Sequence, residues 1–283
     1  MPAAFNNFLH DYIEKLQGTT KHKLNEADFK SGEPIIFALD TSSKITSMAI
    51  ARGDEVIESF AVQADEKRSE RLWLDVQALL DKAGFVISNI ELFGVCTGPG
   101  NFTGLRVGIS AVKGFAAATG KPVAGVTSLE AAAFAARGAA AVCAMINAYK
   151  GEVYSQLFEL NDRGAPVAVN EPLLSTLVEA VERIAHLDEV AFVGDGAIAN
   201  ADVIREVGRE SRAAGKSKGA FCIEQATGSV ANRIARLAYL RFVRGETGTA
   251  ESLRACYVRP AEAEIKLSLG LLGTKIQRSI KAE

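Results

Sequence analysis

The chain has 283 residues, of which 48% are apolar and 23% charged, and its formal net charge is −2. This length suffices for one large domain or two modest ones with a proper core, and the composition is that of a globular protein. The near-neutral charge counts against a surface that binds nucleic acid without a partner, because such surfaces are distinctly basic. The sequence shows neither the apolar run of a membrane span nor a secretory signal, so we expect a cytoplasmic protein without a membrane partner.

Cysteine and histidine spacing restricts the chemistry further. The four cysteines form no C-x-x-C pair, which is typical of a protein from a reducing compartment. The three histidines, His10, His22 and His186, cannot form an H-x-x-x-H or H-E-x-x-H pair. This spacing excludes a helical zinc site, and we expect no metal centre.

Residues 1–33 are predicted to be an N-terminal extension that ends in a linker. Six apolar residues recur at helical spacing and predict a short amphipathic helix: Phe5, Phe8, Leu9, Tyr12, Ile13 and Leu16. A polar run and the turn-forming Ser31-Gly-Glu-Pro34 follow. The apolar stripe must cover something, either the body of the protein or a partner.

The body begins with a run of elements that predicts a mixed sheet with helices packed on it. A buried strand ends in a carboxylate, Asp40, and two strands joined by Gly53-Asp54 follow it as an antiparallel meander. A helix, a further strand and a second helix come next. The expected ranges are 34–40, 46–52 and 55–62 for the strands, 69–83 for the helix, 92–97 for the fourth strand and about 104–119 for the second helix.

The fourth strand runs directly into a glycine turn, Gly98-Pro-Gly100, and the next helix follows without a linker. Glycine accepts backbone angles that are closed to other residues, and Thr103 is the expected N-cap of a helix beginning near Gly104. A helix N-terminus beside such a loop suits a phosphate or carboxylate. Close packing of strand and helix explains the glycines equally well, so both interpretations stand.

The second half of the body repeats this order less cleanly. Two strand-rich halves with matching order indicate an internal duplication with a cleft between them. The last strand ends in Gly194-Asp-Gly196, and the residues after Pro260 are expected to form a tail. The expected ranges are 140–148, 151–159, 166–173 and 189–193 for strands, 175–187 for a helix capped by Ser175, and 227–243 for a long helix.

Two helices of the first half carry more apolar surface than one sheet can cover. A helix on a sheet needs a single apolar face, whereas these two have a second stripe. We expect the pair to form an exposed apolar patch of the kind that binds another protein, with Trp73 as its anchor. The alternative is that the two helices pack on each other. The expected interface residues are Leu72, Trp73, Val76, Leu80, Leu105, Val107, Ala111 and Phe115.

Four segments together resemble the bacterial TsaB family, also called YeaZ. They are Ile35-Ile-Phe-Ala-Leu-Asp-Thr-Ser-Ser43, the loop G-P-G-N-F-T-G-L-R-V-G at 98–108, Ile146-Asn-Ala-Tyr-Lys-Gly-Glu-Val-Tyr154, and Tyr257-Val-Arg-Pro260. The resemblance spans roughly 34–260 and leaves both ends outside. Three positions depart from the family pattern: Arg68 replaces an expected His, Asn101 a usual Ser, and Asn147 a common Asp.

The resemblance implies an α/β fold of two ribonuclease-H-like lobes, of the actin, Hsp70 and sugar-kinase type. We therefore expect an extension (1–33), a first lobe with partner-binding helices (34–134), a second lobe ending in the long helix (135–260), and a tail (261–283). It also implies a non-catalytic scaffold that activates TsaD, a paralogous transferase, within the machinery that installs threonylcarbamoyl on tRNA adenosine. The small ATPase TsaE is the implied third subunit, and tRNA is met only through the complex.

The same resemblance places a set of residues at the cleft between the lobes. They are Asp40, Thr41, Gly98, Gly100, Thr103 and Gly104, with Gly194-Asp-Gly196 on the opposite side. In this fold such residues face a nucleotide, and in a degenerate paralogue Asp40 only caps its turn. We expect no required cofactor and at most weak, vestigial ATP or ADP binding.

Two other functions stay open on the sequence. One is an independent enzyme of this fold: a phosphotransferase, an ATPase or a peptidase. Kinase chemistry needs a base and a metal site. Peptidase chemistry needs a metal pair or an activated nucleophile. The other is a homodimeric binding protein in which the apolar patch pairs with itself. No residue is assigned a catalytic role.

Overall fold

The computed structural model describes residues 32–63, 68–136, 139–148, 151–215, 221–226 and 228–258. Nearly all of the predicted extension (1–33) and the whole predicted tail (261–283) lie outside the described residues. So do Tyr149-Lys150 and Arg259-Pro260, which belong to the two C-terminal motifs.

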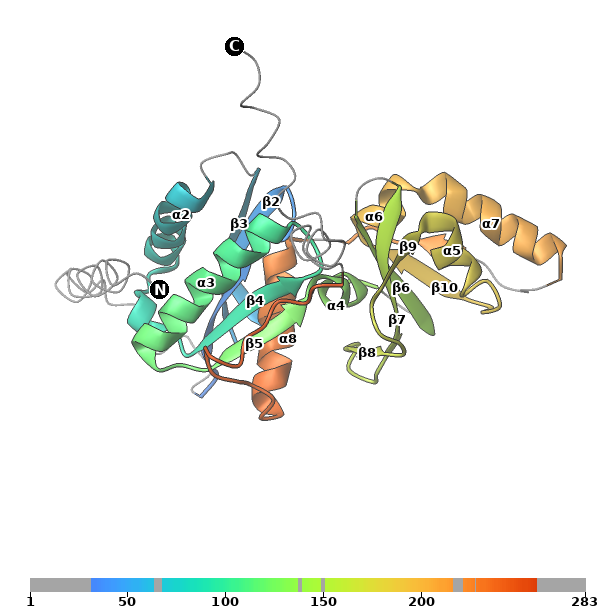
Figure 1. Cartoon of the computed structure of the whole chain (residues 1–283). Coiled ribbons are helices and arrows are strands. Elements are labelled where there is room, and N and C mark those ends of the chain that lie inside the picture. Colours follow the sequence, from blue (N-terminus) through green and yellow to red (C-terminus); the bar gives the residue numbers. More distant parts are fainter. Residues whose placement is uncertain are drawn as a thin grey trace, which may run out of the picture.

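The first lobe is built on a five-stranded sheet of order β3-β2-β1-β4-β5 (Figure 1). β2 pairs antiparallel with β1 and β3, whereas β4 runs parallel to β1 and to β5. This is the mixed sheet that the sequence predicted, extended by a fifth strand. The bounds are Ile35–Asp40 for β1, Ile45–Arg52 for β2, Glu55–Gln63 for β3, Leu92–Gly98 for β4 and Val123–Thr127 for β5.

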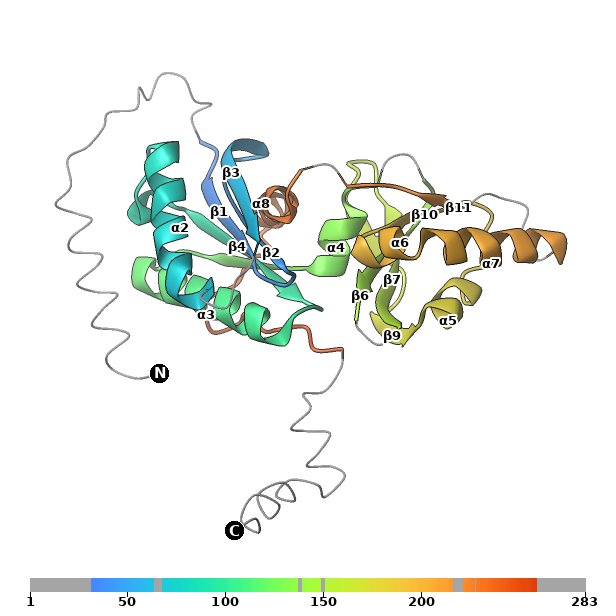
Figure 2. The ribbon, with the colours of Figure 1, turned by 90° about the horizontal axis from the view of Figure 1, so that it is seen from above.

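Helices cover both faces of this first sheet, and alternate residues of β4 show which helix lies where. Phe93 stacks on Phe115 of α3 (Phe102–Thr119), with ring centroids 5.9 Å apart. The next residue, Gly94, faces Ile234 of α8 (Val230–Val243). Because successive residues of a strand point to opposite faces, α3 and α8 lie on opposite sides of the sheet (Figures 1 and 2). α2 (Arg68–Ala83) lies beside α3.

The second lobe repeats the topology of the first. Its six-stranded sheet has the order β11-β10-β6-β7-β8, with β9 pairing to β7. β6 corresponds to β1, because it is antiparallel to β7 and parallel to β10. The predicted duplication and fold class are therefore confirmed. The bounds are Ala141–Asn147 for β6, Glu152–Leu160 for β7, Pro166–Ala168 for β8, Leu173–Thr176 for β9, Val190–Val193 for β10 and Phe221–Ile223 for β11.

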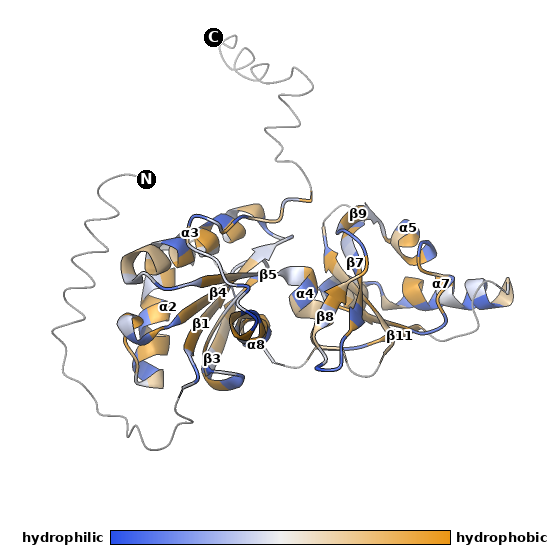
Figure 3. Ribbon diagram, turned by 90° about the horizontal axis from the view of Figure 1, so that it is seen from below, coloured by the Kyte–Doolittle hydropathy of each residue, from blue (hydrophilic) through white to orange (hydrophobic). Residues whose placement is uncertain are grey.

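The two faces of the second sheet bury separate apolar clusters. Cys143 and Phe192 point to the side of α5 (Leu177–Glu182), α6 (Asp195–Ala199) and α7 (Ala201–Ala213). Their neighbours in the strands point to the other side, where α4 (Ser128–Ala133) packs. Strands covered on both faces are apolar almost throughout, and β1 and β4 show the same in the first sheet (Figure 3).

The long C-terminal helix α8 departs from the predicted division of the chain. We expected it to complete the second lobe, 135–260, but it packs on β1, β2 and β4 of the first sheet. Its buried residues Ala231, Ile234 and Ala238 belong to the first apolar core. Placing this helix in the second lobe was therefore wrong, since the order of elements along the chain does not reveal that the chain crosses back.

Several predicted elements differ from those observed. The strand expected at 166–173 is split into β8 and β9, and α5 is capped by Thr176, one residue later than the predicted Ser175. β5, α4, α6, α7 and β11 were not predicted, and neither was the short 3-10 turn η2 (Ile87–Asn89). The remaining strands and helices lie within a few residues of their expected ranges.

Candidate functional site

The turn after β1 uses its polar groups internally. Asp40 is 1% exposed, and its Oδ1 accepts a hydrogen bond from the backbone N–H of Ser42 at 2.9 Å. The Thr41 hydroxyl donates to the carbonyl oxygen of Gly104 at 2.7 Å. Asp40 therefore braces its own turn, and Thr41 joins that turn to the start of α3. The predicted role of Asp40 as a cap of its own turn agrees with this geometry.

The glycine loop packs against that turn so closely that larger residues would collide. A Cβ built on Gly100 would lie 2.4 Å from the carbonyl oxygen of Ser42, and one on Gly108 would lie 2.3 Å from the Thr41 hydroxyl. The backbone N–H of Asn101 donates to the same Ser42 carbonyl at 2.6 Å. Of the two interpretations of these glycines, the structure favours close packing.

The cap of α3 is Asn101 and not the predicted Thr103. The Asn101 Oδ1 accepts from the backbone N–H of Gly104 at 2.7 Å, and its carbonyl oxygen accepts from the N–H of Leu105 at 2.9 Å. Asparagine is among the residues that cap helices best, so this residue suits the position. Because the Gly104 amide is already engaged, it is not free to donate to an anion, which counts against the predicted nucleotide contact at Gly104.

A cation from α8 lies near the buried carboxylate of the first lobe. Burial lowers the pKa of the Arg233 guanidinium, and the charge of Asp40 offsets part of this shift. Arg233 also donates to the carbonyl oxygen of Ala131 in α4 at 2.8 Å. α8 therefore places a positive charge near Asp40, a feature that the sequence did not predict.

The Gly194-Asp-Gly196 segment of the second lobe repeats the packing of the glycine loop. Gly194 has a φ of 98°, and a Cβ there would lie 2.2 Å from the carbonyl oxygen of Met145 in β6. The Asp195 Oδ1 accepts from the backbone N–H of Asn147 at 3.1 Å. This segment, predicted to face a nucleoside, is thus held against the end of β6. Nucleotide binding in the cleft stays a prediction.

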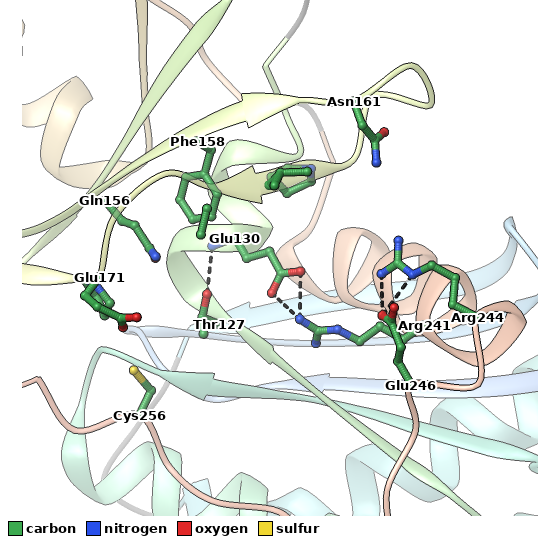
Figure 4. A pocket seen from close by; sticks show the side chains of 14 residues that line it. Thr127, Glu130, Gln156, Phe158, Asn161, Glu171, Arg241, Arg244, Glu246 and Cys256 are labelled. Carbon is green, nitrogen blue, oxygen red and sulfur yellow. Dashed lines mark hydrogen bonds and ion pairs between the residues drawn. The ribbon is translucent and has the colours of Figure 1, made fainter.

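Between the lobes lies a polar pocket of about 550 Å³ (Figure 4). At its centre Arg241 of α8 forms an ion pair with Glu130 of α4, in which the Arg241 Nη2 lies 2.8 and 2.6 Å from the two carboxylate oxygens. Arg241 also donates to the carbonyl oxygen of Gly125. Arg244 and Glu246 form a second pair at the rim, 2.8 Å apart. The pattern Thr127-x-x-Glu130 marks the start of α4 and could have predicted that helix.

Most of the predicted partner interface is buried in the first lobe. Six of its eight residues belong to the core and are at most 5% exposed, so predicting them as surface residues was wrong. They are Leu72, Val76, Leu80, Leu105, Ala111 and Phe115. Part of the second apolar stripe is absorbed by contact between the helices, because Trp73 packs edge-on against Phe115 with centroids 5.0 Å apart. Such ring contacts stabilise a core.

An apolar surface nevertheless remains on the outer side of these two helices. Leu74 is 67% exposed, and Trp73 and Val107 are half-buried. Gly114 and Ala118 follow Val107 along α3 at intervals of seven and four residues, which places them on its side of the helix. Gly114 is half-buried and Ala118 is exposed. We call these five residues the α2–α3 face. Trp73 and Val107 of this face were among the eight predicted interface residues. Leu74 was not, because it lies away from the main apolar stripe of its helix.

The chain after α8 ties two of the sequence motifs together. Gly248 pairs with Val123 at the edge of β5, and the Tyr257 ring packs at a tilt against Phe102 with ring centroids 5.2 Å apart. The Arg106 guanidinium lies 3.8 Å above the Phe102 ring and donates to the Tyr257 hydroxyl at 3.4 Å. Residues distant in sequence thus meet at the start of α3.

These features define a two-lobed α/β protein whose cleft residues bond to one another and whose first lobe keeps an apolar helix face. Within the described ranges, no group of His, Cys, Asp and Glu is arranged to hold a metal ion. The helices described there are also too short or too polar to cross a membrane.

The sequence profile of the family described as TsaD, tRNA N6-adenosine threonylcarbamoyltransferase, matches residues 61–206, about half of the chain. The tRNA threonylcarbamoyladenosine biosynthesis protein TsaB of Escherichia coli (strain K12) is 32% identical over 132 residues, 46% of this chain and 57% of that protein. TsaB of Bacillus subtilis (strain 168) is 30% identical over 127 residues, 44% and 55% respectively. The matches thus span little more than half of these relatives.

A solved structure extends the likeness to most of the chain. It is a Pseudomonas aeruginosa protein described as having similarity to peptidase YEAZ, 26% identical, with a TM-score of 0.64 over 80% of this chain and 100% of that one. The chain belongs to the family that the profile describes, as one of its TsaB (YeaZ) members.

Proposed function

We propose that this protein is a scaffold subunit that activates a TsaD-type paralogue in the threonylcarbamoylation of tRNA adenosine. It binds the paralogue through the α2–α3 face and meets tRNA only within the complex, which a TsaE-type ATPase joins. Family membership supports the pathway, because both TsaB relatives carry threonylcarbamoyladenosine biosynthesis in their names. The observation that carries the scaffold role is the exposure of Leu74.

Among the large apolar side chains of the described residues, that of Leu74 is the most exposed. Leu74 is 67% exposed, and the half-buried Trp73 precedes it in the chain. Burying one leucine side chain contributes about 2 kcal/mol. Aromatic anchors such as tryptophan are the side chains that dominate the energetics of protein interfaces. A helix of the partner laid on this face would bury both residues.

The cleft geometry supports a role without chemistry of its own. Asp40 and Thr41 are each 1% exposed and bond within the loop, and the charge of Arg233 is close to the carboxylate. A catalytic carboxylate that holds a metal-bound nucleotide must be accessible to it. A protein whose cleft residues are engaged in this way would act by binding a partner and not by chemistry of its own.

The test measures complex formation and activity together. The chain and its TsaD-type paralogue are purified separately and mixed, their mass is measured by light scattering, and tRNA modification is assayed with threonylcarbamoyl-adenylate supplied. We expect modification only in the mixture. Leu74→Asp should weaken the heterodimer by at least about tenfold, equivalent to ~1.4 kcal/mol.

The matched control is Val243→Asp, which places the same charge on an exposed apolar residue at the end of α8, where Val243 is 57% exposed. Equal heterodimer affinity of the two variants would contradict the proposal. Robust ATP hydrolysis by the isolated chain would favour the independent enzyme. A stable homodimer that the paralogue fails to dissociate would favour the homodimeric binding protein.

A further inference from the structure

The helix α8 contains three arginines, Arg233, Arg236 and Arg241, and no acidic residue. Each arginine contacts α4 or the residue at its end. Arg241 forms an ion pair with Glu130 in the first turn of α4. The Arg236 guanidinium lies 5.3 Å from the ring centroid of Phe134, the residue at which α4 ends. α8 therefore meets α4 through charged as well as apolar contacts.

Arg233 contacts both connections between the lobes. The first connection is α4, which links β5 to β6, and the second is the segment that links β11 to α8. The Arg233 Nε donates to the carbonyl oxygen of Ala131 in α4 at 2.8 Å, and its Nη1 donates to that of Gly228 in the second connection at 3.1 Å. A guanidinium is planar and rigid, so its donors hold the two carbonyl groups at a fixed separation.

The end of α4 leaves a carbonyl oxygen for this contact. In a regular helix the N–H of Ala135 would donate to Ala131, but here it donates to Ala132 at 3.1 Å. Ala131 thus has one of the carbonyl groups that the end of a helix leaves without a backbone donor. Because Ala131 is fully buried, its oxygen needs a donor from elsewhere, and Arg233 supplies it.

The backbone of this arginine is fixed in the first lobe. The adjacent Ile234 is fully buried in the first apolar core, and the Arg233 guanidinium is close enough to Asp40 for the two charges to interact. Opening or closing of two lobes changes the backbone angles of the segments that connect them. Since one side chain that is anchored in the first core bonds to both connections, such a motion has to break at least one of its hydrogen bonds.

We propose that Arg233, supported by Arg236 and Arg241, fixes the angle between the two lobes, so that the lobes move as one body. A protein that closes its lobes around a ligand needs hinge residues that are free to change their backbone angles. In this protein the cleft and the pocket between the lobes keep their shape with and without a ligand. The inference goes beyond the proposed function, to which it adds a subunit of constant shape.

The test measures the distance between the lobes in the full-length chain. One spin label is attached to Cys222, which is exposed on β11 in the second lobe. The other is attached to a cysteine introduced by Glu55→Cys, at the exposed start of β3 in the first lobe. This parent chain also carries Cys256→Ser, because Cys256 is only half-buried. Double electron–electron resonance then gives the distribution of distances between the two labels.

Two further substitutions are compared in this parent chain. Arg233→Lys keeps the positive charge near Asp40, but an ammonium group lacks the planar fork that reaches both carbonyl oxygens. Arg244→Lys is the matched control, since Arg244 follows the end of α8 and its side chain pairs with Glu246. We expect one narrow distribution for the parent and for Arg244→Lys. Arg233→Lys should broaden this distribution or add a second distance.

A broad or double distribution in the parent chain would overturn the inference, and this outcome does not depend on whether Arg233→Lys folds. Equal distributions for the parent and a folded Arg233→Lys would overturn it as well. So would a shorter distance in the parent after ATP and Mg²⁺ are added, because the lobes would then have closed. Failure of the paralogue to bind would refute the proposed function and leave the distance result unchanged.

Discussion

The two lobes share one strand order but present different outer surfaces. In the first lobe the outer helices α2 and α3 carry the α2–α3 face, on which Leu74 is 67% exposed. In the second lobe the outer helix α7 carries ion pairs, Arg205 with Asp202 and Arg209 with Glu206. Exposed ion pairs of this kind contribute little to stability, and their charged groups stay hydrated. The comparison teaches that α7 of the second lobe pairs charges on its surface, whereas α2 of the first lobe leaves Leu74 largely exposed.

The inner surfaces are more alike, because each sheet is covered there by a helix that contacts the other lobe. α8 covers the first sheet and α4 the second, and Arg241 and Glu130 join the two helices. A glycine after β4 in the first lobe and one after β10 in the second serve packing as well. Gly100 sits against Ser42 and Gly194 against Met145. Duplication has thus preserved the strand-to-helix turns that the fold needs.

The largest expected effect tests whether the two lobes unfold together. Phe93 and Phe192 are fully buried in the first and second sheets. Phe93→Ala and Phe192→Ala should each lower the free energy of unfolding by about 3–5 kcal/mol. Because α4 and α8 join the lobes, both variants should shift one common urea transition. Far-UV circular dichroism reports both lobes and Trp73 emission reports the first. A Phe192→Ala variant with an unchanged Trp73 transition would show that the lobes unfold independently.

The junction between the lobes gives the next effect. Arg241→Ala leaves the half-buried Glu130 carboxylate and the Gly125 carbonyl without their partner, and the side chains of the pair are only 21% and 14% exposed. We expect a loss of about 3 kcal/mol in the free energy of unfolding, near the lower end for a buried pair. Arg244→Ala, which breaks an exposed pair just after the end of α8, should cost under about 1 kcal/mol. Equal urea midpoints for the two variants would refute the distinction.

Helix caps give a smaller effect and compare the lobes directly. Asn101 caps α3 in the first lobe and Thr176 caps α5 in the second. Asn101→Ala and Thr176→Ala should each lower the free energy of unfolding by about 1 kcal/mol, measured by urea titration. Thr103→Ala is the control, since Thr103 is exposed and does not cap α3. A larger loss of unfolding free energy for Thr103→Ala than for Asn101→Ala would indicate that Thr103 caps α3, as the sequence predicted.

Thiol labelling gives the smallest effect and sharpens the contrast between centre and edge strands. Burial raises the pKa of Cys143 to about 12, and burial together with the charge of Asp40 raises that of Cys96. Cys222 is exposed on the edge strand β11. At pH 8 a thiol reagent should therefore modify Cys222 first and leave Cys96 and Cys143 unmodified until the protein unfolds, because the thiolate is the reactive form.

The same pKa shifts fix the sign of a pH effect. A thiol whose pKa is raised on folding stabilises the protein fully below the pKa of the unfolded thiol, near 9. That contribution is lost as the pH rises through the pKa of the folded state. We expect the urea midpoint to fall at alkaline pH, and Cys143→Ser, with no thiolate to form, to lose less. Rapid native labelling of Cys143 at pH 8 would contradict its burial.

The sequence by itself determined the two mixed sheets, since apolar strands covered on both faces and their order are local patterns. It also located the glycine loop and the amphipathic helices. It did not determine that α8 returns to the first sheet, or that Asn101 takes the cap from Thr103, because each depends on contacts between distant segments. β5 and α4 escaped notice although Thr127-x-x-Glu130 marks the helix start.

Only the tertiary structure decided which apolar residues of α2 and α3 reach the surface. Helical periodicity assigned two stripes, but Trp73 and Phe115 pack together between the helices and remove part of the second stripe from water. Leu74, which periodicity set aside, remains exposed. The reason is physical: periodicity gives the direction of a side chain from its own helix axis, whereas exposure depends on what else occupies that direction.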